Sequence, residues 1–455
     1  MNRTSQFTRR TFIKSAAIAV PTIVSPSSLG LAGTVSPSNR ITLGLVGCGL
    51  HGSSWNLDQV FRNDDSEVIA VCDVDRERLG NAKAKVDAHY TRKFGRSDQG
   101  CTVHDDFRDL INRSDIDAVI NCTPDHWHVI PAIMAAKTGK DVICEKPLTL
   151  TIAEGRTLCN VIEQTGRIFQ TASENRSLDT YIRLCELVRN GRIGKLQHIR
   201  VTLPQGNESR GANFNLTDVC SPPEGFNYEM WQGQAPLSPY CPARCHGSFR
   251  WNLAYSGGRL TDWGAHLIDL AQWANDTETT GPIEVVGTGT FPPREALRNT
   301  ATDFDIDYKY ANGVTLNVSS SQPGIRFEGS EGWVGCEGWR ATLTASDDKI
   351  LASNIGPDEI QLHRPRIVIA REDGGKGGEH RNFIDCVKSR EPCYAPAETG
   401  HRTISIAHIG NIALLLGRKL KWDPSAERFD NDAANQMLSR RQREPWTIEN
   451  IDSWI

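Results

Sequence analysis

The 455-residue chain has no apolar run long enough to cross a membrane and no excess of positive charge. A membrane-spanning helix needs about 20 consecutive apolar residues, so we expect no membrane anchor. The formal net charge is −4, and residues 1–32 carry four bases and no acid. The rest of the chain is therefore still more acidic, which argues against nucleic acid as a partner. A neutral, polyhydroxylated substrate meets no such electrostatic penalty.

Paired cysteine clusters are also scarce, although the chain has 13 cysteines. Cys241 and Cys245 lie four residues apart with Cys220 upstream, a spacing that invites a zinc or disulfide interpretation. No second pair with zinc-finger spacing follows. We therefore expect no metal site and reduced cysteines, those in strands acting as small apolar residues.

The first residues have the pattern of an export signal. Residues 8–14 (TRRTFIK) resemble the twin-arginine motif, a short apolar segment follows, and Gly30-Leu31-Ala32 offers a cleavage site. The apolar segment is too short for a membrane anchor. We expect residues 1–35 to be a signal peptide that directs the protein through the twin-arginine export machinery, into the periplasm or otherwise out of the cytoplasm.

A glycine-rich motif follows the first expected strand. Residues 41–46 (ITLGLV) are apolar, Gly47, Gly49 and Gly52 form a GxGxxG motif before an expected helix to Val60, and a second strand ends at Asp73. This is the dinucleotide fingerprint. Its glycines allow a tight turn, close approach of the pyrophosphate to the backbone and close packing of helix on strand, and its acid accepts hydrogen bonds from the ribose hydroxyls. The acid favours NAD over NADP, although Arg76 and Arg78 nearby weaken that preference.

Strands and helices continue to alternate to about residue 168. Residues 115–124 and 141–147 predict further strands, and residues 128–140 predict a helix that Asp125 of the DHWH segment caps. Alternation predicts a doubly wound parallel sheet with ligands at the carboxyl ends of its strands. Thr123, Pro124 and the Glu145-Lys146-Pro147 segment lie at such ends. We assign residues 40–168 to a Rossmann domain.

The pattern changes after about residue 169. Residues 196–203, 283–291, 303–310 and 314–320 predict strands separated by loops, as in an antiparallel sheet. Between them, GGRLTDWGAH predicts a helix capped by Thr261. Asp262 and His266 are four residues apart and share one face of that helix. We assign residues 169–455 to a second, substrate-binding domain.

These motifs, in this order, resemble the glucose–fructose oxidoreductase/inositol dehydrogenase/MocA family over about residues 40–450. The resemblance implies a Rossmann domain followed by an α/β domain with a large, mostly antiparallel open sheet, commonly used for oligomerisation. It implies that the lysine of EKP, Lys146, lies beside the nicotinamide and the reacting hydroxyl. It also implies NAD-dependent oxidation of a sugar or cyclitol by a homo-oligomer, a dimer or tetramer.

Oxidation of a secondary alcohol requires a hydride acceptor and a base for the hydroxyl proton. His266 suits the base because its pKa is near neutral. Lys146 stabilises the developing alkoxide, and Asp262 hydrogen-bonds or orients the substrate. Without the other motifs, a surface ion pair or a helix cap would be the preferred interpretation of Asp262 and His266.

The expected site residues fall into two sets. The catalytic set is Lys146, Asp262 and His266. The residues expected to bind the cofactor are Gly47, Gly49, Leu50, His51, Gly52, Asp73, Thr123, Pro124, His128, Glu145 and Lys146.

Other polar and aromatic residues leave alternatives open. Trp231, Arg244, Arg250 and Trp251 fit either a sugar pocket or packing, and Glu174-Asn175-Arg176 fits a polar stretch beside the nicotinamide only loosely. For Glu379, His380 and His401 we expect structural roles, and residues 372–380 read as a flexible loop.

Two other functions remain open. A glycosidase or epimerase of the same fold would use its NAD transiently and regenerate it, although the glycosidase branch typically replaces the lysine found here as Lys146. A non-catalytic sugar-binding relative is disfavoured by the intact motifs.

Overall fold

The computed structural model describes residues 35–36, 39–95, 100–206, 215–362 and 378–455. Residues 41–455 form one compact unit, and the first 40 residues are a separate unit. Apart from Val35, the predicted export signal lies outside the described residues. Within the described ranges, every helix is too short or too polar to cross a membrane.

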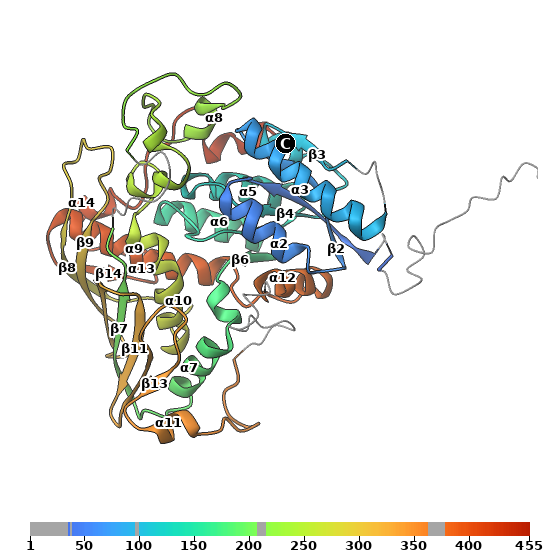
Figure 1. The fold of residues 1–455 in the computed structure, drawn as a ribbon. Coiled ribbons are helices and arrows are strands. Elements are labelled where there is room, and N and C mark those ends of the chain that lie inside the picture. Colours follow the sequence, from blue (N-terminus) through green and yellow to red (C-terminus); the bar gives the residue numbers. More distant parts are fainter. Residues whose placement is uncertain (1–34, 37–38, 96–99, 207–214, 363–377) are drawn as a thin grey trace, which may run out of the picture. The chain divides into compact units, whose positions relative to one another are not determined.

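The first half of the compact unit is built on a six-stranded sheet (Figure 1). Its order is β3-β2-β1-β4-β5-β6, and every pairing is parallel. The strands are β1 (Ile41–Val46), β2 (Ser66–Cys72), β3 (Thr102–His104), β4 (Ala118–Asn121), β5 (Asp141–Cys144) and β6 (Phe169–Thr171). This is the doubly wound order, in which the direction of winding reverses between β1 and β4 and ligands bind beyond the strand ends there.

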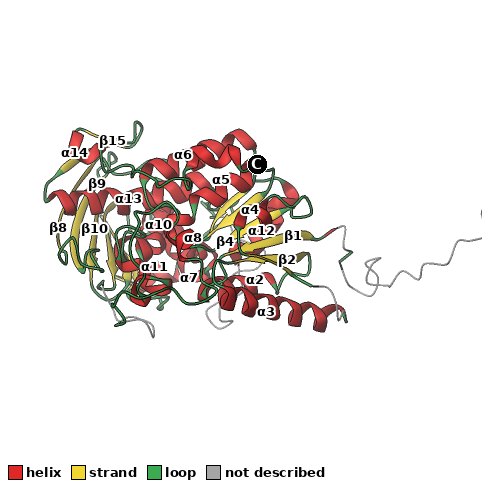
Figure 2. Ribbon diagram, turned by 90° about the horizontal axis from the view of Figure 1, so that it is seen from above, coloured by secondary structure: helices red, strands yellow, loops and turns green. Residues whose placement is uncertain are grey.

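Helices lie on both faces of this sheet (Figure 2). Strands β4 and β5 are wholly buried, as expected for a parallel sheet covered on both faces. The helices of this half are η3 (His51–Asn56), α2 (Leu57–Val60), α3 (Arg76–Phe94), α4 (Phe107–Ile111), η4 (Asp125–Trp127), α5 (Val129–Lys137), α6 (Ile152–Thr165) and, from late in the sequence, α12 (Gly378–Ser389).

Local sequence explains several helix starts. The Asp75 carboxylate accepts hydrogen bonds from the amides of Glu77 and Arg78 at the start of α3. Thr151 and Glu154 form a capping box at the start of α6. The expected cap at Asp125 is wrong: its carboxylate instead accepts a 2.6 Å hydrogen bond from the Ser256 hydroxyl.

Two segments, β6 and the start of α12, bear on the expected boundaries. Strand β6 belongs to the first sheet although it follows residue 168, and the domain boundary itself stays a prediction. The expected loop 372–380 lies partly outside the described residues, and its last part, 378–380, is the buried start of α12. Helix α12 contacts α2, β5 and β6, so this face is covered by a segment distant in sequence.

The second half contains a nine-stranded sheet of order β13-β12-β11-β7-β10-β9-β8-β14-β15. Its pairings are antiparallel except β7 with β10, so the sheet is mixed rather than antiparallel throughout. The strands are β7 (Leu196–Leu203), β8 (Glu284–Thr290), β9 (Asp303–Lys309), β10 (Thr315–Ser320), β11 (Gly324–Gly329), β12 (Trp333–Cys336), β13 (Thr344–Ala345), β14 (Leu420–Asp423) and β15 (Arg428–Phe429).

Helices α10 and α13 lie between the two sheets (Figure 1). They pack on each other, and α13 also contacts α6, β6 and β8. All 11 residues of α10 are buried, so this helix has no solvent-exposed face. The helices and short helical turns of this half are η5 (Glu174–Ser177), α7 (Asp179–Arg189), α8 (Tyr228–Gln232), η6 (Pro242–Arg244), η7 (His246–Trp251), α9 (Arg259–Asp262), α10 (Gly264–Ala274), α11 (Asp348–Ala352), α13 (Ala397–Leu416), α14 (Asp432–Asn435) and η9 (Ile448–Ser453).

The helix expected to start at Thr261 is in fact two helices. Gly258 precedes α9, Trp263 separates α9 from α10, and the Thr261 hydroxyl donates to the Gly258 carbonyl at 3.1 Å instead of capping. Thr261 is unavailable as a cap because it lies inside the first turn. The break leaves Asp262 at the end of α9 and His266 in the first turn of α10.

Candidate active site

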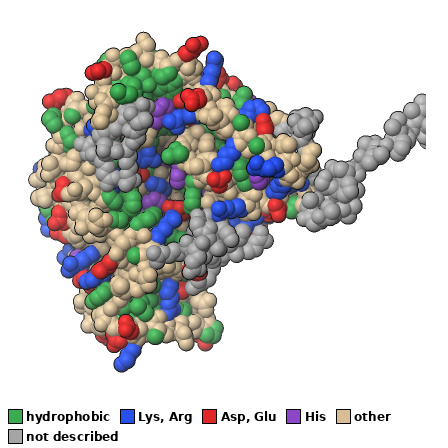
Figure 3. Space-filling model, viewed as in Figure 1, with side chains coloured by type: hydrophobic (Ala, Val, Ile, Leu, Met, Phe, Trp, Pro, Cys, Tyr) green, Lys and Arg blue, Asp and Glu red, His purple; other side chains and the backbone are tan. Residues whose placement is uncertain are grey.

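A cavity of about 770 Å³ lies beyond the carboxyl ends of β1, β2, β4 and β5. This volume is within the usual range for small-molecule sites. Two stretches of the second half, 226–251 and 259–263, supply the opposite wall. Figure 3 shows one face of the molecule, with basic and histidine side chains gathered in a recess near its middle.

The glycine loop follows β1 and borders the cavity. Gly47 has φ +94°, and a Cβ there would lie 2.5 Å from the Cys122 carbonyl, while a Cβ on Gly52 would lie 2.1 Å from the Gly47 oxygen. Gly49 differs, because a Cβ there would meet only the Arg78 guanidinium at 3.2 Å. Two glycines thus allow close packing, and the third keeps the backbone open toward the cavity, as approach of a pyrophosphate requires.

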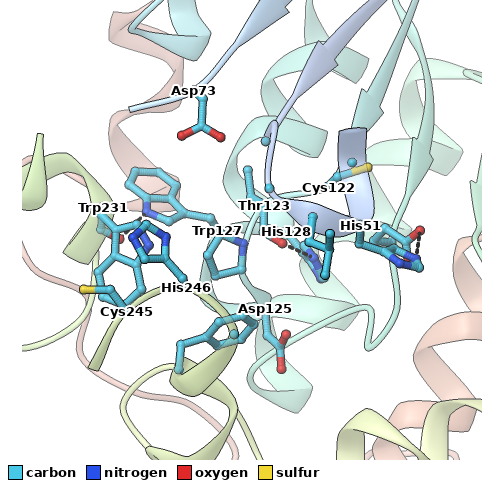
Figure 4. Close-up of a pocket in the computed structure, with 18 of the residues that line it drawn as sticks. His51, Asp73, Cys122, Thr123, Asp125, Trp127, His128, Trp231, Cys245 and His246 are labelled. Carbon is cyan, nitrogen blue, oxygen red and sulfur yellow. Dashed lines mark hydrogen bonds and ion pairs between the residues drawn. The ribbon is translucent and has the colours of Figure 1, made fainter. Parts of the chain in front are cut away.

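Asp73 lies just after β2, and its carboxylate points into the cavity (Figure 4). It accepts hydrogen bonds from the amide of Cys48 at 2.6 Å and from that of Asp75 at 2.9 Å, which fixes the glycine loop to the end of β2. Burial raises the pKa of Asp73 to about 6, although these amides oppose the shift. Hydroxyl donors such as those of a ribose would favour the ionised carboxylate.

Thr123, Pro124 and His128 line the cavity after β4. The two ring nitrogens of His128 lie 2.7 Å from the Pro147 carbonyl and 2.8 Å from the Thr123 carbonyl. His128 therefore connects the loop after β4 to the loop after β5, and both of its ring nitrogens are occupied by backbone carbonyls.

The buried Glu145 carboxylate is the centre of a hydrogen-bond network that reaches the half-exposed His51. It is 2.9 Å from His51, and it accepts hydrogen bonds from Asn56 at 2.9 Å and from the Lys146 amide at 3.1 Å. Burial alone would raise the pKa of Glu145, but His51 outweighs it and holds that pKa well below its usual range. Burial opposes protonation of His51, yet the Glu145 carboxylate raises the pKa of the imidazole.

The network continues through residues that the sequence analysis assigned to no site. The His380 ring lies 2.8 Å from the Asn56 amide oxygen, and the Trp55 indole donates to Glu379 at 3.2 Å. Their partners lie more than 300 residues away in sequence, so no local pattern signals them. His401 pairs with Glu427 at 2.7 Å, in the structural role expected for it.

Lys146 and Asp262 meet at the cavity wall. The Lys146 ammonium donates to the Asp262 carboxylate at 2.9 Å and to its main-chain oxygen at 3.1 Å. Arg250 at 3.3 Å and Arg259 at 3.5 Å also contact the carboxylate. Although burial opposes ionisation, Lys146 and the arginines hold the pKa of Asp262 far below its usual range. Asp262 is therefore a permanent anion and no acid or base.

His266 is buried one turn beyond Asp262. Burial, and then the Lys146 charge, lowers the pKa of His266 well below its usual value, so the ring is neutral near pH 7. Its Nδ1 is buried without a hydrogen-bond partner among the described residues, and its ring packs on Trp339 with centroids 5.1 Å apart. Within the described chain, His266 does not line the cavity, unlike Lys146 and Asp262.

The other residues expected at the site divide into those that line the cavity and those that do not. All the predicted cofactor-binding residues line the cavity, as do Trp231, Arg250 and Trp251, whereas Arg244 and the 174–176 stretch do not. Arg176 is instead fully buried and paired with Asp269 at 2.7 Å. All 13 cysteines are free, and the described residues contain no cluster of side chains suited to a metal ion.

These features fit a dinucleotide. The open backbone at Gly49 and the amides at the start of the 51–60 helical segment suit a pyrophosphate, and Asp73 suits a ribose. Arg78, the nearest side chain to Gly49, lies on the same wall and also contacts Asp75 at 3.3 Å.

Comparison with known proteins agrees with this geometry. Residues 41–173 match the family described as "Oxidoreductase family, NAD-binding Rossmann fold". Residues 185–353 and 373–448 match "Oxidoreductase family, C-terminal alpha/beta domain".

The individual relatives have low sequence identity to this chain. The chain is 25% identical over 397 residues to myo-inositol 2-dehydrogenase of Thermotoga maritima, covering 83% of this chain and 95% of that protein. It is 32% identical over 187 residues to a glycosyl hydrolase family 109 protein of Shewanella pealeana, a match that spans only 40% of either protein.

A solved structure of levoglucosan dehydrogenase, in complex with NADH and levoglucosan, has the same fold with a TM-score of 0.58. It is 18% identical, covering 84% of this chain and 99% of that one. The two family matches together span most of the described chain, with the glycine loop and Lys146 in the first and Asp262 and His266 in the second. The chain therefore belongs to the glucose–fructose oxidoreductase/inositol dehydrogenase/MocA family of oxidoreductases.

Proposed function

We propose that the protein is an NAD-dependent oxidoreductase that acts on a secondary hydroxyl of a sugar or cyclitol. The observation that carries this proposal is one cavity that is lined by the glycine loop and Asp73 and also by the Lys146–Asp262 pair. The relatives named for inositol and levoglucosan support the substrate class.

Bound NAD would supply the hydride acceptor, and residues of this chain would handle the substrate oxygen and its proton. Lys146, held by Asp262, donates to the substrate oxygen and stabilises negative charge as it develops there. His266, neutral because of burial and then the Lys146 charge, is the proposed final acceptor of the hydroxyl proton. Because its ring does not line the cavity, the proton would reach it through a group that does. Trp251 and Arg250 offer an aromatic face and hydrogen-bond donors to the ring hydroxyls.

The test is activity of Lys146→Ala and His266→Ala with nucleotide binding measured in the same samples. We expect kcat/KM with a panel of sugars and cyclitols to fall by about 10²–10⁴-fold in each, with nucleotide binding retained. Lys349→Ala, on an exposed helix, is the matched control. Undiminished oxidation in both site variants would contradict the assignment.

A redox-neutral glycosidase or epimerase is the second candidate, favoured by the match to the glycosyl hydrolase family 109 protein. Lys146 favours net oxidation, because the glycosidase branch typically replaces this lysine. Product analysis separates the two: net oxidation yields keto sugar with reduced nicotinamide in equal amounts, whereas redox-neutral turnover yields product without it.

We also propose export through the twin-arginine machinery to the periplasm, supported by the motif at residues 8–14. Self-association as a dimer or tetramer would use the nine-stranded sheet, on which β9 presents every second residue to solvent. Light scattering of the purified protein tests the oligomeric state.

A further inference from the structure

Residues 225–256, which we call the latch, leave the second half of the chain and attach to the first half at the turn after Asp73. The Arg76 amide donates to the Gly225 carbonyl at 3.0 Å, and the Asn227 amide donates to the Val74 carbonyl at 2.9 Å. Asp75 and Phe226 thus form an antiparallel bridge. This pairing begins one residue beyond the carboxylate that is expected to hold the ribose.

A second attachment fixes the latch to the loop after β4. The Trp127 indole donates to the carbonyls of Met230 and Trp231, each at 3.0 Å, and the His126 ring lies 2.9 Å from the Trp231 carbonyl. The Ser256 hydroxyl donates to Asp125 at 2.6 Å. The latch is therefore tied down on both sides of the cavity rather than at one edge.

The latch is a packed structure of its own. Its aromatic rings form a separate buried cluster that contains Phe226, Tyr228, Trp231, Tyr240, Phe249 and Tyr255. Such a cluster resists local opening because opening exposes several large apolar side chains at once. A closed latch is thus the stable state of this segment.

Three side chains surround the end of the cavity next to Asp73. Arg78 comes from the first half, and Phe226 and His246 come from the latch, with their rings 5.4 Å apart. His246 Nε2 is 3.9 Å from the Asp75 carboxylate, and burial together with Arg78 lowers the pKa of His246 to about 4, leaving a neutral ring. Two neutral rings and a guanidinium suit the flat face of an adenine.

We propose that the latch encloses the adenosine half of the dinucleotide and slows its release. This inference rests on the proposed function, since it assumes that the cavity holds NAD. Release of the nucleotide requires the pairing between residues 74–76 and 225–227 to open.

Arg76 allows this pairing to be weakened with little other damage. Arg76 is the first residue of α3, and Asp75 before it is extended (φ −111°, ψ 108°), so proline is tolerated there. Arg76→Pro removes the amide that donates to Gly225, whereas Arg76→Ala keeps it. His246→Gly removes the second ring at a position whose φ of +55° glycine adopts freely.

The experiment measures exchange of bound nucleotide against isotopically labelled NAD, followed by mass spectrometry, in the purified full chain. We expect the wild type to exchange slowly, and Arg76→Pro and His246→Gly to exchange about five- to tenfold faster, as the loss of one contact of this kind implies. Arg76→Ala and Asp348→Pro, the latter also a first helical residue but on an exposed helix, should exchange like the wild type.

The outcomes separate the two proposals. If the protein binds NAD but Arg76→Pro exchanges at the wild-type rate, the latch is overturned and the proposed function stands. If the protein neither carries nor takes up NAD, the proposed function fails. Slow exchange in all variants, His246→Gly included, would also overturn the latch.

Discussion

Lys146 owes its position to charged neighbours that come from both halves of the chain. Asp262 binds its ammonium group, and Glu145 accepts from its amide. Burial first, and then the positive charge of Lys146, lower the pKa of His266 well below its usual value, and Arg340 adds to this shift while Asp262 and Glu145 oppose it. His266 is therefore neutral and available as a base near neutral pH.

The pH dependence of turnover tests His266 at the residue scale. Because its pKa is lowered, the acidic limb of kcat/KM should lie below the ordinary histidine range. Arg340 contributes to that shift, so Arg340→Gln raises the pKa of His266, moves the limb to higher pH and lowers the rate on the limb by about two- to threefold. The rate at high pH should be nearly unchanged.

Arg418→Gln, at an exposed position after α13, serves as the charge-matched control and should leave the profile in place. An equal pH shift of the acidic limb of the kcat/KM profile in both variants would indicate a general charge effect. A limb that stays fixed in Arg340→Gln contradicts titration of His266.

Element by element, sequence patterns predicted the first sheet well and the helices of the second half poorly. Strands such as Ala118–Asn121 are short apolar runs ended by Thr123-Pro124, a strong local signal. Helix α10 has no solvent-exposed face, because all of its residues are buried, so a contrast between an exposed and a buried face could not place its start. Thr261 therefore looked like a cap, whereas the start of α9 depends on Gly258, whose positive φ and nearness to Thr300 leave no room for a side chain.

Gly258 is the element-scale test of how Asp262 is positioned. Its backbone (φ +76°, ψ −157°) is accessible essentially to glycine alone, and a Cβ there would lie 2.6 Å from Thr300. We expect Gly258→Ala to lower the free energy of unfolding by about 3 kcal/mol, from strain and overpacking together. Displacement of α9 should also weaken the Lys146–Asp262 contact and reduce activity.

Gly139→Ala is the matched control, because Gly139 also has a positive φ (+84°) but has nothing within 4 Å of an added Cβ. We expect Gly139→Ala to lower the free energy of unfolding by about 1 kcal/mol, from backbone strain alone. Equal losses in urea denaturation of the two variants would mean that the Thr300 contact has no effect.

At the scale of the whole molecule, the sequence could indicate only those candidate site residues that directly follow predicted strands. The glycine loop, Asp73 and Lys146 follow strands, and the parallel topology brings strand ends to one edge. The partners of Asn56 and Trp55, and the attachment of the latch to residues 74–76, join segments far apart in sequence. Such contacts have no local signature, so only the folded chain shows them.

The latch and the expected export signal together make one prediction about the whole molecule. The twin-arginine route carries folded proteins, so the chain would load NAD in the cytoplasm and keep it after export. Protein recovered from the periplasm should then contain bound nucleotide, and Arg76→Pro should contain about five- to tenfold less than Arg76→Ala. Replacing Arg9 and Arg10 with lysine should leave the protein, with its nucleotide, in the cytoplasm. Exported wild-type protein without nucleotide would refute this account, since an enzyme outside the cytoplasm has no ready pool from which to replace a lost cofactor.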